Sequence, residues 1–185
     1  METDNIERYL NSFGKYVVKQ SRTNLTKEKK NVNKDLYNSI KYELKITNQG
    51  FSVDFYMLDY GTFVDKGVSG KKNIQEFKTY DGRKVASPFQ YKNRMPPPNI
   101  ISKWIKARGI KPTGFKRGRD TKSGQFISGL SYLIARKIQM QGIKSTSFFQ
   151  RPLGLAMKRF GVGLTRAVKE DLLSQFSDEI KTSIE

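Results

Sequence analysis

The sequence predicts an α+β fold: a small, bent antiparallel sheet of about three or four strands, an N-terminal helix, a helical insertion and a long C-terminal helix. Three observations predict it. Apolar residues recur every three or four positions near both ends of the chain, which is typical of amphipathic helices. Apolar and polar residues alternate between 41 and 57, which is typical of a strand hairpin. Prolines at 96–98 separate these parts from a basic stretch with helical spacing.

In the first third of the chain, helical spacing over 5–20 predicts a helix, with Asp4 or Asn5 as its N-cap. The polar, lysine-rich residues 21–33 either prolong this helix or form an exposed link. A short helix is expected over 36–40 with Asn33 as its cap, followed by an antiparallel hairpin over 42–57 that buries one face.

In the middle of the chain, residues 60–67 predict a short helix closed by Gly67. A second hairpin is expected over 75–91, with a two-residue type I′ turn at Asp81-Gly82. Pro98 suits the first position of a further helix, and Gly109 ends it.

Near the end, the glycine-rich and basic residues 114–124 predict a mobile loop. A helix is expected over 128–142, with Ser128 as its cap. The last helix opens with Pro152, and apolar residues recur along it as far as Leu172. Gly161 and Gly163 weaken its middle, so we expect a bend there.

Size and composition favour a folded chain without disulfides. The chain has 185 residues, of which 36% are apolar and 12% aromatic, so a core can form. It has no cysteine and no histidine, which excludes disulfides, thiolate or imidazole zinc sites and Ser-His-Asp triads. No apolar run approaches the ~18 residues of a membrane span, and the start, Met1 to Asp4, is acidic rather than basic as in a signal peptide. We expect a soluble protein made in a reducing cytosol, with no membrane partner.

The positive charge is concentrated in the second half of the chain. The formal net charge is +18. Residues 82–169 contain 20 Lys or Arg and one acid, so they carry +19 and the remainder carries −1. Such a block cannot be neutralised by internal ion pairs, so it suits a polyanion, an acidic partner or a channel that something anionic crosses; the alternative is a merely solvated face. We expect a single domain over 1–185 with a basic helical and loop insertion at about 92–127.

Direct nucleic-acid binding is one reading of this block. Tyr91, Trp104, Phe115 and Phe126 are interleaved with the basic residues as candidate stacking groups. The spacing of Trp104 from its isoleucine neighbours favours a core position over a stacking platform. No sequence-reading motif is present, so any contact would be to the phosphate backbone. The basic residues that could face DNA or drive assembly are Lys103, Lys106, Arg108, Lys111, Lys116, Arg117, Arg119 and Lys122.

A metal-dependent nuclease is a weaker reading. Glu76-Phe77-Lys78 has the acid-x-Lys form of many nucleases, and Asp59 or Asp65 would supply the upstream carboxylate for Mg²⁺. The motif is short and frequent by chance in surface strands. No phosphate-binding glycine loop is present, which argues against nucleotide-dependent catalysis. We assign no catalytic residue, no metal site and no cofactor.

Several short motifs follow one another in a fixed order over about 33–168: LYNSI at 36–40, YGTFVDKG at 60–67, MPP at 95–97 leading to Trp104, and SFFQRPL at 147–153. This order resembles the tail-completion, or head-to-tail connector, proteins of tailed bacteriophages. Two features depart from the family pattern, namely the FFQRP form of the last motif and the large basic insertion. The residues that carry the resemblance are Asn38, Ser39, Ile40, Tyr60, Val64, Asp65, Gly67, Pro96, Pro97, Trp104, Phe149, Arg151 and Pro152.

The resemblance implies a structural virion protein that forms a homo-oligomeric ring in the phage neck, assembled in the host bacterial cytoplasm, and no enzyme. Its expected neighbours are a portal or adaptor protein and tail or other neck proteins. DNA passes through such a ring, so diffuse contact with DNA is tolerated. A ring also needs a wedge whose repeated contact closes on itself. We expect the loop Lys116 to Lys122 to be an assembly element. The principal alternative is a sequence-independent nucleic-acid-binding protein, and the nuclease is third.

Overall fold

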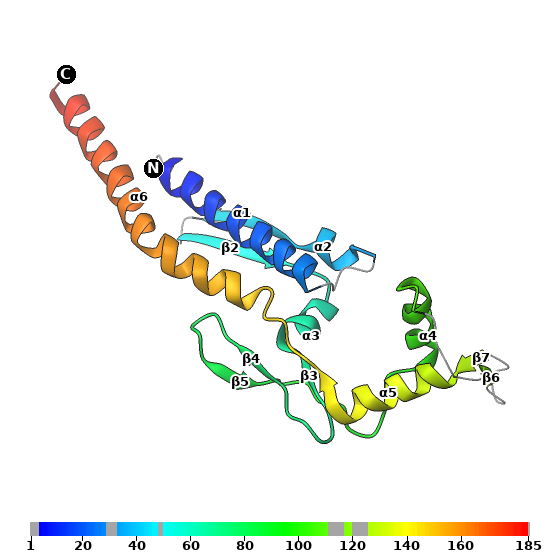
Figure 1. Cartoon of the computed structure of the whole chain (residues 1–185). Helices are drawn as coiled ribbons and strands as arrows, with labels where there is room; N and C mark the ends of the chain where they lie inside the picture. Colours follow the sequence, from blue (N-terminus) through cyan, green and yellow to red (C-terminus); the bar gives the residue numbers. More distant parts are fainter. Residues whose placement is uncertain (1–3, 29–32, 48–49, 111–116, 120–125, 185) are drawn as a thin grey trace. The chain divides into compact units, whose positions relative to one another are not determined.

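The computed structural model describes residues 4–28, 33–47, 50–110, 117–119 and 126–184. The chain forms two compact units. The first comprises Met1–Leu58, Thr79–Arg83 and Phe148–Glu185, and the second comprises Asp59–Lys78 and Lys84–Ser147. The predicted α+β class is confirmed, with long N-terminal and C-terminal helices and small antiparallel strand pairs (Figure 1).

Two long helices, α1 (Asp4–Lys27) and α6 (Gln150–Ile184), pack side by side in the first unit (Figure 1). The apolar stripe of α1 is buried at Ile6, Val17 and Leu25. The ring of Phe160 on α6 contacts three α1 rings at centroid distances of 5.5 to 5.7 Å, those of Tyr9, Phe13 and Tyr16. Aromatic packing of this kind adds to the burial of apolar area that holds the two helices together.

The hairpin of β1 (Lys41–Thr47) and β2 (Gly50–Tyr56) packs against α1. The ring of Tyr42 lies over Gly14 of α1, where any side chain would overlap the ring. The antiparallel pairing of β1 with β2 confirms the predicted hairpin. Its buried face, however, extends over only part of its length, because Ile46 is 47% exposed toward the turn.

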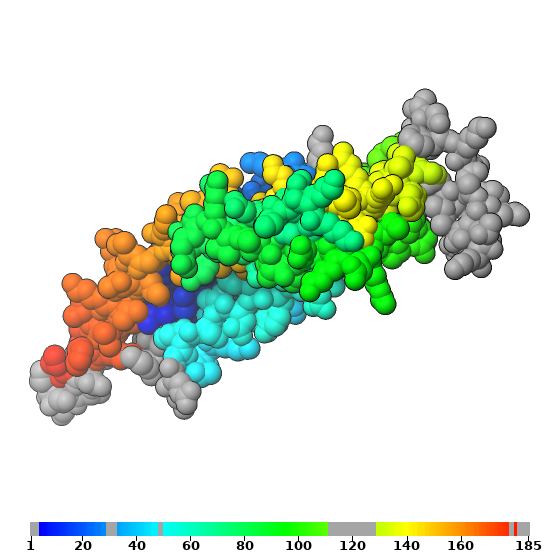
Figure 2. All heavy atoms as spheres, turned by 90° about the horizontal axis from the view of Figure 1, so that it is seen from below, coloured from blue at the N-terminus to red at the C-terminus, as the bar shows by residue number. Residues whose placement is uncertain are grey.

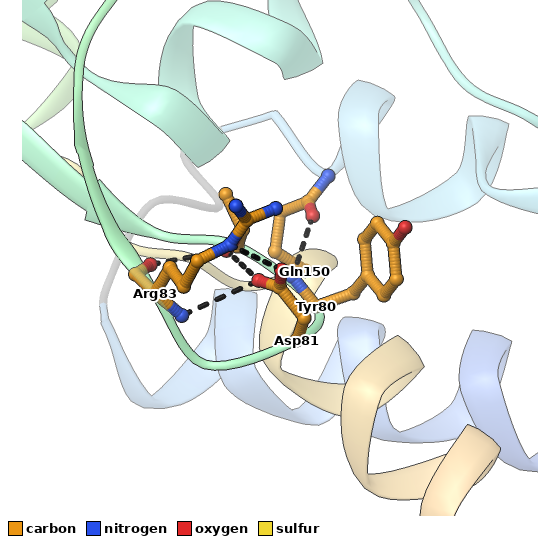
Figure 3. Close-up of polar contacts among 5 residues, drawn as sticks. Tyr80, Asp81, Arg83 and Gln150 are labelled. Atoms are coloured by element: carbon orange, nitrogen blue, oxygen red, sulfur yellow. Dashed lines mark hydrogen bonds and ion pairs between the residues drawn. The ribbon is translucent and has the colours of Figure 1, made fainter.

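The segment Thr79–Arg83 also belongs to the first unit, where it contacts the start of α6 (Figure 3). The side-chain Oε1 of Gln150 accepts a hydrogen bond from the backbone N–H of Tyr80 at 3.1 Å. The Thr79 N–H donates to the Arg83 carbonyl at 2.9 Å, and Gly82 has a φ of +92°. The expected two-residue turn is thus wrong: three residues form the loop, with the glycine supplying the positive φ that this loop length requires.

The second unit begins with α3 (Tyr60–Lys66) and two short strand pairs. β3 (Val68–Ser69) pairs with β8 (Gly142–Ile143), and β4 (Glu76–Lys78) pairs with β5 (Lys84–Ala86). The chain therefore returns from residue 142 to the strand that follows α3.

Two further helices, α4 (Pro98–Ala107) and α5 (Gly129–Gln141), pack against each other in the second unit. Pro98 opens α4, and Gly109 follows it with a φ of +64°, as predicted. β6 (Arg117–Arg119) pairs with β7 (Phe126–Ser128), so part of the predicted loop is a strand. The other residues of that loop, 114–116 and 120–124, lie outside the described residues.

Several sequence predictions need correction. The described strands form separate two-stranded pairs and not one sheet of three or four strands, because helices and long connections separate the hairpins. The helix that starts at Asp4 continues to Lys27, which answers the open question about 21–33. The N-cap of α2 (Asp35–Ser39) is Lys34, with a φ of +59° and no side-chain cap, so Asn33 is not the cap. The last helix begins at Gln150, with Pro152 within its first turn.

Candidate functional site

The first of the motifs that carry the family resemblance, LYNSI at 36–40, connects α2 to β1. The Ser39 Oγ donates to the Leu36 carbonyl at 2.9 Å and accepts from the Leu58 N–H at 3.2 Å. Ile40 is fully buried, whereas Asn38 is exposed. This motif therefore fixes where the chain leaves the helix and enters the hairpin.

The second motif ends α3 and is held by the segment that precedes α6. The Val64 carbonyl accepts from both the N–H and the Oγ1 of Thr146, and the Asp65 carbonyl accepts from the Ser147 N–H at 2.9 Å. Gly67 has a φ of +73° and lies against the backbone of residues 143 and 145, so only glycine fits. Asp65 is buried, and Tyr60 is 45% exposed.

The last motif starts α6 in the first unit. Phe148 and Pro152 are buried, while Arg151 is exposed. The ring of Phe149 lies edge-on to that of Phe55 of β2 at a centroid distance of 5.4 Å. The motif residues are thus distributed over joints in both units and do not converge on one cavity; Pro96 and Pro97 precede α4, with Pro97 as its N-cap.

The basic residues fall into three groups. Lys103 and Lys106 on α4 and Arg108 at its end are exposed. Arg117 and Arg119 lie in β6. Lys111, Lys116 and Lys122, and with them most of the proposed assembly loop, lie outside the described residues. α5 adds two exposed cations that the sequence analysis did not include, Arg136 and Lys137.

Four of these cations, Lys103, Lys106, Arg136 and Lys137, make no ion pair with any described residue; we call them the α4–α5 cations. By sequence, the second unit carries a net charge of +14 and the first +4. The positive charge is therefore concentrated in one folded unit, and α4 and α5 present part of it without neutralisation.

Trp104 is not a core residue, contrary to the sequence prediction. Its side chain is 40% exposed, and the Arg108 guanidinium lies 5.9 Å from the ring centroid. Ile105 is buried on the same helix, whereas Ile100 is 58% exposed. The reason is that α4 is short and is covered on one side by α5 and β7, so only a narrow part of its apolar face is buried.

The other proposed stacking groups give less to a nucleic-acid surface. Tyr91 is half-buried, and burial raises the pKa of its phenol, which therefore stays neutral at physiological pH. Phe126 lies in β7, and Phe115 lies outside the described residues.

The proposed nuclease residues do not form a metal-binding group in the described part of the chain. Glu76 and Lys78 are exposed on β4, whereas Asp65 is buried in α3. Within the residues that the structure describes, no three carboxylate side chains gather closely enough to hold a metal ion. A Mg²⁺ centre needs such convergence.

The sequence analysis missed an exposed apolar surface on α6. The apolar recurrence predicted along this helix ended at Leu172 and did not include residues 173–180. In the structure, Val162 is 81% exposed, Phe176 60% and Ile180 59%. A groove of about 210 Å³ also opens between α1 and α6, and its lining is almost entirely apolar. Apolar residues at helical spacing over 173–180 form a second series, next to the series that ends at Leu172. This second series is the sequence signal that could have indicated the exposed surface.

No protein-family model, curated protein or solved structure matches the chain. Among the helices of the described residues, none has both the length and the hydropathy that a membrane-spanning helix requires.

Proposed function

We propose that the chain is a structural subunit of the neck of a tailed phage, a head-to-tail connector or tail-completion protein that works as a homo-oligomeric ring through which DNA passes. The observation that carries the proposal is the ordered series of motifs. Each motif lies where one helix or strand ends and the next begins. Its buried residues and hydrogen bonds hold that connection in place, as a fold with this order of elements requires.

The exposed surfaces support a protein that is covered within a larger assembly. Monomeric soluble proteins rarely expose large contiguous apolar patches, yet the described part of α6 exposes several large apolar side chains along its second half. The second unit adds the α4–α5 cations, which make no ion pair with a described residue. Portal, adaptor, tail or other neck proteins, and the passing DNA, are the partners that such surfaces would meet.

Immunogold electron microscopy tests the proposal. Antibody raised against the purified chain is applied to particles from cells that carry the gene, with particles lacking the gene as the control. We expect gold at the junction of head and tail. Cells that lack the gene should yield heads and tails that are not joined to each other. Infectious particles that assemble normally without the chain would overturn the proposal.

Sequence-independent DNA binding is the second candidate, favoured by the α4–α5 cations and the exposed Trp104. Phosphate contacts of this type give an affinity that falls steeply with salt and does not depend on base sequence. A purified chain that binds duplex DNA tightly in this way, but is absent from particles, would replace the neck proposal with this one.

A further inference from the structure

The α1/α6 groove is an apolar depression on the first unit. Tyr9, Leu10 and Phe13 of α1 line one side of it, and Met157, Phe160 and Leu164 of α6 line the other. Its volume of about 210 Å³ is below the range of about 300–1,000 Å³ typical of pockets for small molecules. The groove is therefore suited to apolar side chains of a protein and not to a cofactor.

The C-terminal part of α6 carries a matching apolar face. Leu173, Phe176 and Ile180 are 55%, 60% and 59% exposed, and we call them the C-terminal stripe. Their spacing places them on one face of the helix, as in helices that dock their side chains into an apolar groove. Figure 2 shows this orange-to-red part of α6 at the surface. It extends beyond Asp171, whose carboxylate contacts the first turn of α1.

The groove and the stripe cannot meet within one chain. The stripe and one side of the groove both belong to α6, which is one continuous helix from Gln150 to Ile184. Leu164, at the end of the groove, and Leu173, at the start of the stripe, are separated by about 14 Å of helical rise. A stripe can therefore enter a groove only in another molecule.

The charges of α6 favour a second copy of this chain as that other molecule. Residues 151–169, which include the α6 side of the groove, contain five basic residues and no acid. Residues 170–185, which include the stripe, contain five acids and one lysine, and four of these acids remain when Asp171, which is buried against α1, is left out. This order is the reverse of what the helix macrodipole favours, so an isolated helix gains nothing from it. Docking the acidic end of one copy on the basic part of another brings opposite charges together.

We propose that the C-terminal stripe of one copy docks into the α1/α6 groove of the next copy. The contact is head-to-tail, so it leaves a free groove on one molecule and a free stripe on the other, and it repeats until a ring closes. The inference rests on the proposed function in one respect, because it requires a chain that assembles with copies of itself.

Complementation between two variants tests this contact. Phe176→Glu places a charge in the stripe, and Met157→Glu places one in the groove; both side chains are at least half exposed, so the core is unaffected. Sedimentation of each variant alone should show self-association weakened by about thirtyfold or more, the loss expected for a central interface residue. An equimolar mixture should form dimers and stop there, since only one intact stripe and one intact groove remain.

Ile74→Glu is the matched control, because Ile74 is 72% exposed in the second unit and should tolerate the charge without effect. The inference is overturned if the wild-type chain stays monomeric at its highest soluble concentration, if both variants associate like wild type, or if the mixture stays monomeric. If both variants still associate, the docking contact is wrong, but the ring of the proposed function is not contradicted, because another contact can form it. Absence of the chain from particles removes the neck function but not a contact measured in solution.

Cysteine cross-linking provides an independent measurement, because the natural chain contains no cysteine. We expect a short bis-maleimide to link Met157→Cys to Phe176→Cys only when the two variants are mixed, and to give a ladder of oligomers with the double variant. The pair Ile74→Cys and Phe176→Cys should give no product. Equal cross-linking of the control pair would contradict the assignment.

Discussion

The side chain of Asp171 on α6 caps the N-terminus of α1 by accepting a hydrogen bond from the backbone N–H of Ile6 at 3.0 Å. The same carboxylate accepts from the N–H and the Nδ2 of Asn5, at 3.3 and 2.7 Å, and Asp171 is only 4% exposed. The first N–H groups of a helix have no partner within the helix. Here a residue more than 160 positions later supplies the partner, so the cap also fixes the pairing of α1 with α6.

Asp171→Ala should lower the free energy of unfolding by ~1–3 kcal/mol, because it leaves buried N–H groups of α1 without an acceptor. Chemical denaturation followed by far-ultraviolet circular dichroism measures the change. Glu170→Ala is the control: this neighbouring side chain is exposed, and the change should stay within about 0.5 kcal/mol. Equal effects of the two substitutions would contradict the capping role.

Gly161→Ala and Gly163→Ala should change stability in opposite directions, although the two glycines are close neighbours on α6. A Cβ at Gly161 meets open space, so alanine should stabilise the helix by ~1 kcal/mol. A Cβ at Gly163 would overlap the hydroxyl and ring of Tyr9, whose hydroxyl donates to the Phe160 carbonyl at 2.9 Å. This substitution should destabilise by ~1–3 kcal/mol. Thermal unfolding of both variants decides the matter, and a stabilising Gly163→Ala would show that the two helices are not packed this closely.

The carboxylate of Asp81 should titrate below its ordinary pKa of 3.8. The Thr79 hydroxyl is the main cause, followed by the backbone N–H and guanidinium of Arg83, all of which donate to the charged form (Figure 3). Because the folded-state pKa is lowered, the resulting stability is present above pH 3.8 and is lost as the pH falls through the folded-state pKa.

Carbon-detected NMR titration measures this pKa. Thr79→Val should raise it toward 3.8, whereas Thr62→Val, whose hydroxyl donates to the Asp59 carbonyl, should leave it unchanged. An Asp81 that titrates at 3.8 in the wild-type chain would be inconsistent with the loop geometry described above.

Lys106→Gln or Lys137→Gln should each reduce the salt dependence of duplex-DNA binding, with the slope of log K against log salt falling by about 1. Both side chains are exposed and make no ion pair with a described residue. Lys41→Gln is the control, because its ammonium pairs with Glu43 at 3.2 Å in the first unit. Fluorescence anisotropy at several salt concentrations measures the slopes, and three equal reductions would show that DNA has no preference for the α4–α5 cations.

Local signals in the sequence predicted most elements of the fold. Pro98 and Gly109 bound α4 as expected, because proline fixes φ at the first helical position and glycine accepts the positive φ that follows the helix, whatever the surroundings. Alternation predicted the β1 and β2 hairpin. The two-residue strands β3 and β8 could not be predicted, because their pairing joins residues about 75 positions apart and leaves no periodic pattern.

The candidate surfaces were predicted less well. Charge counting located the basic half, but the exposure of Trp104 depends on how little α5 covers α4, which spacing does not reveal. Likewise, the predicted apolar recurrence of the last helix ended at Leu172 and did not include Phe176. In the structure, α1 begins opposite Asp171, and α6 continues beyond that point to Ile184. The last part of α6 is therefore not covered by α1.

The first unit joins residues from both ends of the chain, 1–58 and 148–185, around the second unit in sequence. During synthesis, α1 and its hairpin leave the ribosome while α6 has yet to be made. At ~5–20 residues per second, the rest of the chain takes roughly 6–25 s to follow. Throughout that interval Phe13 lacks the Phe160 ring that it contacts in the folded chain, so its apolar surface stays accessible to a chaperone until α6 has been made.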